Sequence, residues 1–92
     1  MGVLSPKDGE TTYDATDCVI YPGWVNTHHH LFQSLMKGVP VGMNMSLLPW
    51  LEAVPVSYRH FATADNIRIA ATIGMAELLL SGCTTIADHH YA

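Results

Sequence analysis

Two apolar segments of this chain, residues 24–30 and 83–88, each run into histidines, and one long helical pattern separates them. Over residues 63–80, apolar side chains recur at the i, i+3, i+4 spacing of an amphipathic helix. Thr63 is expected to cap the start of this helix, and Gly82 to follow its end. The apolar stripe consists of Ile67, Ala70, Ala71, Gly74 and Leu78, widened by Ile69, Ile73, Ala76 and Leu80. Because a helical connection makes two strands parallel, the sequence predicts a strand–helix–strand unit of the α/β class.

The remaining segments have weaker patterns. Short strands are predicted at residues 11–13 and 18–21, where β-branched and aromatic side chains gather. One or two helical turns are expected at residues 31–37. Residues 38–50 have no clean period and indicate a long loop or lid, with a helical turn near residues 47–53.

The segment at residues 24–30 ends in three consecutive histidines. Its first half is apolar and is expected to be buried on both faces of a sheet. Because side chains alternate along a strand, His28 and His30 point to one face and His29, a bystander, to the other. Positions i and i+2 lie about 6–7 Å apart at Cα, which lets both imidazoles reach one metal ion at about 2.0–2.1 Å. His28 and His30 are therefore the predicted metal ligands, and partly buried histidines without a metal are the alternative.

A second cluster, Asp88, His89 and His90, ends the predicted strand at residues 83–88. Parallel strands bring their carboxyl ends to one edge of the sheet, where ligands and catalytic groups collect. We expect His89 to face the predicted metal site while His90 and Tyr91 cover its edge, although the register does not choose firmly between the two histidines. The string TTIADHH also resembles the metal-binding motif of the DHH phosphoesterases. That reading is disfavoured, because the sequence lacks the DxD motif of that family.

The composition indicates the interior of a larger protein. With 92 residues, 49% hydrophobic and 13% charged, the chain is unusual for a free-standing small domain, which buries only about two-thirds of its unfolded surface. A net charge of −4 without a basic run argues against nucleic acid and membranes as partners. Cys18 and Cys83 fit reduced thiols, and neither a signal peptide nor a membrane-length apolar run is present, so a cytoplasmic protein is expected.

The residues VIYPGWVNTHHH, from Val19 to His30, resemble the signature of the amidohydrolase superfamily: an apolar strand, Pro-Gly, two apolar residues, Asp or Asn, any residue, then HxH. The strings NTHHHLFQSL and GCTTIADHHY are similar to the cytosine/guanine-deaminase-like branch, in particular 8-oxoguanine and isoxanthopterin deaminases, with triazine hydrolases as near relatives. The resemblance implies a metal-dependent (β/α)8 TIM barrel preceded by a small β-sandwich. Residues 1–21 would be the end of the β-sandwich segment, and residues 22–92 the first βαβ portion of the barrel.

The resemblance also implies hydrolytic deamination at one divalent metal ion, zinc or else iron. Hydroxide formed near neutral pH attacks a ring carbon that carries an amino group, and ammonia leaves after proton transfer by a general acid/base. The substrate would be an oxidised purine, a pterin or a related heterocycle. The site residues that the resemblance implies are the metal ligands His28 and His30 and the substrate-binding residues Gln33, His89 and His90.

The 92 residues depart from this family in length and in the rest of the site. A (β/α)8 barrel needs about 250 residues, and the family takes a further His ligand, an Asp ligand and a Glu/His pair from later strands. We therefore expect the general acid/base to lie outside this chain, the isolated chain to be inactive, and its partner to be the remainder of the barrel or another copy in a homo-oligomer. A non-catalytic metal-binding or assembly module is the alternative. A metal site of His28, His30 and His89 is geometrically conceivable.

Overall fold

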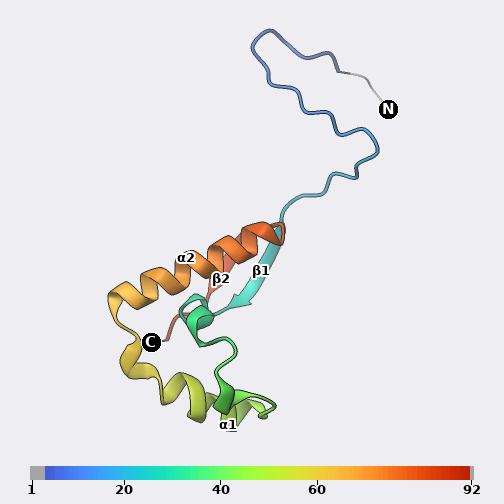
Figure 1. Ribbon diagram of the computed structural model, residues 1–92. Coiled ribbons are helices and arrows are strands. Elements are labelled where there is room, and N and C mark those ends of the chain that lie inside the picture. Colours follow the sequence, from blue (N-terminus) through green and yellow to red (C-terminus); the bar gives the residue numbers. More distant parts are fainter. Residues whose placement is uncertain (1–3, 92) are drawn as a thin grey trace.

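A two-stranded parallel sheet with one long helix forms the body of the structure (Figure 1). The computed structural model describes residues 4–91. Strand β1 (Trp24–His29) pairs with β2 (Cys83–Asp88), and helix α2 (Ala64–Leu80) leads back to the start of β2. The predicted helix and the two strands beside it are confirmed to within one residue. Because the strands are parallel, their histidine-bearing ends share one edge of the sheet.

Helix α2 begins and ends at the residues that the sequence marks. The Thr63 hydroxyl accepts the Asn66 N–H at 3.3 Å and satisfies a donor of the first turn. Gly82 follows the helix with a φ of +84°, a left-handed conformation that most side chains disfavour. The Gly82 carbonyl then accepts the Trp24 N–H at 2.9 Å. This turn therefore aligns the start of β2 with the start of β1.

The covered face of α2 packs against η1 (Leu31–Met36), the short helix that follows the histidines. The two helices approach closely at Gly74, because a Cβ there would lie 2.6 Å from Ser34 Oγ and 2.8 Å from Leu31 Cδ2. The predicted stripe is this face: its buried or half-buried members are Ile67, Ala70, Ala71, Gly74 and Leu78. The residues expected to widen the stripe are exposed instead: Ile69, Ile73, Ala76 and Leu80.

Short helices, and not an open loop, fill most of the segment between η1 and α2. They are η2 (Pro40–Gly42), α1 (Leu47–Leu51), η3 (Glu52–Val56) and η4 (Arg59–Phe61). The helical turns predicted at residues 31–37 and 47–53 are thus confirmed. Within the described part of the chain, no helix has the length and apolar character needed to cross a membrane. The buried apolar side chains of the described residues are Leu31, Phe32, Val54, Ala70 and Cys83.

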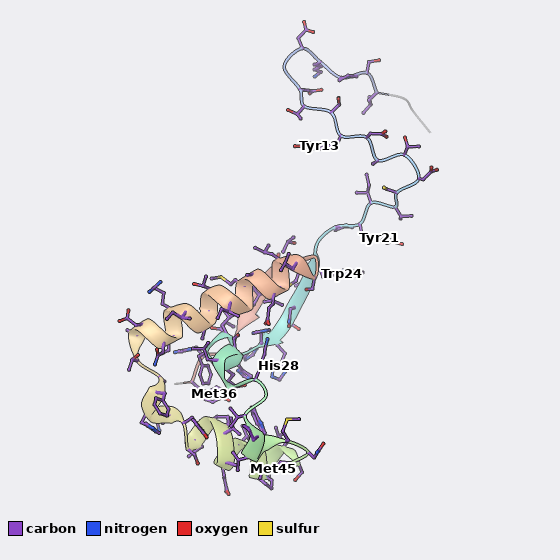
Figure 2. All side chains as sticks on the ribbon, in the orientation of Figure 1. Tyr13, Tyr21, Trp24, His28, Met36 and Met45 are labelled. Carbon is purple, nitrogen blue, oxygen red and sulfur yellow. The ribbon has the colours of Figure 1, made fainter. Side chains whose placement is uncertain are left out.

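The strands predicted at residues 11–13 and 18–21 are wrong for this structure. Residues 4–23 run away from the body as an extended segment without strand pairing (Figure 1). Figure 2 shows Tyr13 and Tyr21 on this segment, and their side chains are 87% and 69% exposed. A strand is stabilised by hydrogen bonds to a neighbouring strand, and within the described residues this segment has no such neighbour. The assignment of residues 1–21 to a β-sandwich stays a prediction.

The first half of β1 is not buried on both faces, contrary to the expectation from its composition. Trp24 and Val25 are 63% and 64% exposed. A sheet of two strands has two open edges, and one packed helix covers only one of its faces. The described residues therefore expose apolar strand surface that a larger sheet would cover.

Candidate metal centre

His28 and His30 converge at the end of β1. Their Nε2 atoms lie 3.2 Å apart, and the two rings are perpendicular. His28, labelled in Figure 2 at the end of the strand, is exposed, and His30 is half-buried. Two nitrogen ligands of one tetrahedral zinc ion, each at 2.0–2.1 Å, are about 3.3 Å apart. The separation of these atoms therefore fits a shared metal, and the assignment of both histidines as ligands stays a prediction.

A backbone group of the neighbouring segment orients His30. The His30 Nδ1–H donates to the His89 carbonyl at 2.6 Å. In a neutral imidazole this bond places the proton on Nδ1 and leaves the Nε2 lone pair free to accept or to bind a metal. Metal-binding histidines commonly have such a partner on their second nitrogen. The His30 ring is thus held in the tautomer that a metal ligand needs.

His89 is tied to β1 by two further bonds. Its backbone N–H donates to the His29 carbonyl at 2.8 Å, and its Nε2–H donates to the Thr27 carbonyl at 3.0 Å. The ring centroid of His89 lies 5.3 Å from that of His28 and 5.9 Å from that of His30. Among residues 4–91, however, no three His, Cys, Asp or Glu side chains form a group that could hold a metal ion. The conceivable three-histidine site therefore has no support here.

His90 has a different aromatic neighbour from His89. Its ring packs edge-on against Phe32, with centroids 5.4 Å apart. The sequence left open which of the two residues faces His28 and His30, and in the structure it is the His89 ring that lies beside them. The assignment of both His89 and His90 to the substrate stays a prediction.

A side-chain hydrogen bond joins Gln33, on η1, to Tyr91, which follows β2. The Gln33 side-chain amide donates to the Tyr91 hydroxyl. The Tyr91 ring also packs edge-on against His30 and Phe32, with centroids 5.1 and 5.0 Å apart. Sequence reasoning placed Tyr91 at the edge of the site but missed this bond. Gln33 and Tyr91 are 58 positions apart in the chain, too far for any spacing pattern to indicate the bond.

His28 and His30 border a cavity of about 270 Å³, which is also lined by Gln33, Ser34 and Trp50. His29 borders it as well, although strict alternation would turn this side chain away. The pairing of β1 with β2 is irregular between Asn26 and His29, and such irregularities redirect side chains. The His29 Nδ1 and Ser34 Oγ atoms are buried without a hydrogen-bond partner among the described residues. Both residues line the cavity, but these two atoms themselves have almost no accessible surface.

Asp88, the last residue of β2, bonds to the backbone that follows the three histidines. Its Oδ1 accepts the backbone N–H of Leu31, the first residue of η1, at 2.9 Å. In the strand pairing, Asp88 lies opposite His29. Sequence reasoning placed Asp88 at the edge of the sheet where ligands collect, or in a phosphoesterase motif. The structure instead shows its carboxylate bound to the backbone directly after the histidines.

Comparison with known proteins gives a consistent assignment. A model of the amidohydrolase family matches residues 19–92. The chain is 58% identical to an isoxanthopterin deaminase from an unknown prokaryotic organism, over 99% of this chain and 19% of the relative. It is 48% identical to an 8-oxoguanine deaminase of Pseudomonas aeruginosa, over 86% of this chain and 17% of the relative.

A further relative is the hydroxydechloroatrazine ethylaminohydrolase of Pseudomonas sp. strain ADP, 40% identical over 96% of this chain and 18% of that protein. No solved structure matches the chain. The chain thus spans less than a fifth of the length of these three curated relatives. The family match takes in β1, α2, β2 and all the histidines described above. This chain belongs to the amidohydrolase family.

Proposed function

We propose that this chain is the first βαβ portion of a (β/α)8-barrel hydrolase that deaminates an amino-substituted heterocycle. The observation that carries the proposal is the 3.2 Å separation of the His28 and His30 Nε2 atoms at the carboxyl end of a parallel strand. Ligand-binding groups of parallel α/β proteins collect at this edge. The names of the relatives, which are deaminases and an aminohydrolase, support a C–N hydrolase.

His28 and His30 would hold one divalent metal, zinc in this proposal and iron as the alternative. The chemistry that such a metal supplies is Lewis acidity, which makes hydroxide available near neutral pH. His28 and His30 contribute their Nε2 lone pairs, and the His89 carbonyl keeps the His30 proton on Nδ1. The further ligands and the general acid/base would come from polypeptide beyond these residues.

The substrate would enter the cavity beside the histidines. Gln33 borders this cavity and can hydrogen-bond a heterocycle through its amide. His89 and His90 do not line this cavity, and they would reach the substrate from the end of β2, together with the aromatic rings of Phe32 and Tyr91. Oxidised purines and pterins are the proposed class, because two relatives are named for isoxanthopterin and 8-oxoguanine. Both are flat, polar rings, which aromatic side chains can contact face-on or edge-on.

The remainder of the barrel, or a second copy in a homo-oligomer, would cover the apolar surface of this portion. The exposed Trp24 and Val25 of β1 and the open strand edges support this proposal, because such surfaces are hazards in an isolated protein. Neither nucleic acid nor a membrane is proposed as a partner, given the net charge of −4. The cytoplasm is the proposed location, which the free thiols of Cys18 and Cys83 support.

A second candidate is a non-catalytic metal-binding or assembly module. The observation that favours it is that residues 4–91 bring together no third metal-binding side chain. Such a module would bind metal through His28 and His30 and would release no ammonia from any heterocycle.

The test uses the full-length protein that contains this chain. We would measure metal content and ammonia release from isoxanthopterin and 8-oxoguanine, for the wild type and for the His28→Ala and His30→Ala variants. The proposal expects turnover in the wild type and loss of both metal and turnover in each variant. His60→Ala is the matched control, because His60 lies on η4, where its Nδ1–H donates to the Ser57 carbonyl and its ring packs on Phe61. Full turnover after either ligand change would refute the assignment, and bound metal without turnover would favour the module.

A further inference from the structure

We propose that Asp88 is a positioning residue for the metal centre: its carboxylate fixes the backbone that follows His30, and thereby the direction of the His30 ring. The inference rests on the proposed use of His28 and His30 as metal ligands. It does not depend on which heterocycle is deaminated. It assigns to Asp88 a role that is neither metal coordination nor contact with the substrate.

The first observation is the position of His30 at the start of η1. His30 occupies the N-cap position of this helix with φ −133° and ψ 84°, and its own side chain makes no capping bond. The first N–H groups of a helix lack partners within the helix and must find them elsewhere. The Leu31 N–H finds its partner in Asp88 Oδ1 at 2.9 Å, in a part-buried contact. A carboxylate acceptor makes this a charge-assisted bond, stronger than one between neutral groups.

The second observation is that the neighbouring residue acts on the same turn. His89, next to Asp88 in the chain, accepts the His30 Nδ1–H and donates its own N–H to the His29 carbonyl. Two consecutive residues at the end of β2 therefore bond to three consecutive residues at the end of β1. The Asp88 bond holds the backbone on one side of His30, and the His89 bonds hold its ring and the backbone on the other side. Such support of a metal ligand raises metal affinity because the ligand is oriented before the ion arrives.

The third observation separates this role from that of a ligand. Asp88 Oδ1 is engaged by Leu31, and the carboxylate belongs to no group of three potential metal ligands within residues 4–91. A positioning acceptor needs an oxygen at this place, but it does not need a negative charge. Asparagine retains that oxygen and removes the charge, whereas alanine removes both.

The experiment compares Asp88→Asn and Asp88→Ala in the full-length protein. Zinc affinity is measured by competition with a chromophoric chelator, and fold is checked by circular dichroism. We expect Asp88→Ala to weaken zinc binding roughly 10–100-fold, the range for loss of a ligand's supporting group. Asp88→Asn is expected to stay within a few-fold of the wild type. Equal, severe losses in both variants would make Asp88 a ligand, and unchanged affinity in Asp88→Ala would remove its positioning role; either result overturns the proposal.

Two further readouts keep the result decisive. The ¹⁵N chemical shifts of His30 report its tautomer, and we expect Asp88→Ala to lose the fixed Nδ1–H form that Asp88→Asn keeps. If Asp88→Ala fails to fold, the near-isosteric Asp88→Leu takes its place as the variant without the oxygen, and Asp88→Asn still tests the ligand role, because that role predicts a large loss of affinity in this variant. Failure of the deaminase proposal looks different: the wild type would bind zinc through the histidines but release no ammonia. A wild type whose zinc affinity is unaffected by His28→Ala would overturn both proposals.

Discussion

His30 donates its Nδ1–H to the backbone carbonyl of His89, a residue 59 positions later in the chain, at 2.6 Å. The contact comes from the main chain of His89, so it does not depend on the side chain at that position. The His89 ring makes a separate bond, from its Nε2–H to the Thr27 carbonyl. The two roles of this residue can therefore be tested independently.

Replacement of His89 by alanine should weaken zinc binding much less than replacement of His28. The carbonyl that orients His30 remains in His89→Ala, and only the bond to Thr27 is lost. A neutral hydrogen bond of this kind contributes about 1 kcal/mol, or roughly fivefold in affinity. Chelator competition on both variants of the full-length protein measures the difference. Equal losses would show that His89 is itself a third ligand.

Replacement of Tyr91 by phenylalanine should impair substrate binding and leave metal content unchanged. The ring contacts with His30 and Phe32 are retained, whereas the hydroxyl that accepts the Gln33 amide is lost. Loss of one hydrogen bond that orients Gln33 should raise KM about fivefold. Steady-state kinetics with isoxanthopterin measures this change. Gln33 and Tyr91 form one hydrogen bond, so Tyr91→Phe should raise KM little further in a protein that already carries Gln33→Ala. If the two changes raise KM by fully additive free energies, the two residues are not coupled.

Replacement of Gly74 by alanine should destabilise the packing of α2 on η1. The new Cβ would lie 2.6 Å from Ser34 Oγ and 2.8 Å from Leu31 Cδ2. Both atoms end side chains that are buried, with 8% and 9% exposure, so neither can turn away freely. Overpacking typically costs about 1–3 kcal/mol, and we expect this cost to exceed the gain in helix propensity of about 1 kcal/mol. The free energy of unfolding in urea should therefore fall. Thr72→Ala is the control on an exposed face of the same helix, and an equal or greater stability of Gly74→Ala would contradict the close approach.

Replacement of Gly82 by alanine should destabilise the turn between α2 and β2. The φ of +84° at this position is left-handed, and an ordinary side chain pays about 1–2 kcal/mol there. Asparagine tolerates this region better than alanine does. The expected order of melting temperature is therefore wild type, Gly82→Asn, then Gly82→Ala. A Gly82→Ala protein as stable as the wild type would show that the turn can adopt another conformation.

Local patterns sufficed to predict the elements that carry the site. The 3.6-residue period identified α2 and its covered stripe, because that stripe packs against η1 within this same chain. Alternation along a strand paired His28 with His30, since residues two apart on a strand share a face. The family resemblance, read from the Pro-Gly and HxH strings, is confirmed by the match over residues 19–92.

Long-range relationships were beyond the reach of these patterns. The strands expected at residues 11–13 and 18–21 depend on neighbours that the described residues do not supply. The choice between His89 and His90 depends on the register between β1 and β2, which is irregular in two places. The bond from Leu31 to Asp88 joins residues 57 positions apart, and no local propensity encodes it.

The hydrogen bonds of Asp88 and His89 to residues 29–31 also have a consequence for the kinetics of folding. Two of these bonds join residues that are 59 and 57 positions apart, and the entropy of closing such long loops is lost before the contacts form. His28 and His30 are neighbours in sequence from the moment of synthesis, but their fixed tautomer and direction arise only after α2 has brought β2 back to β1. The oriented half-site should therefore assemble late in folding. Tight metal capture would then report that the crossover has closed.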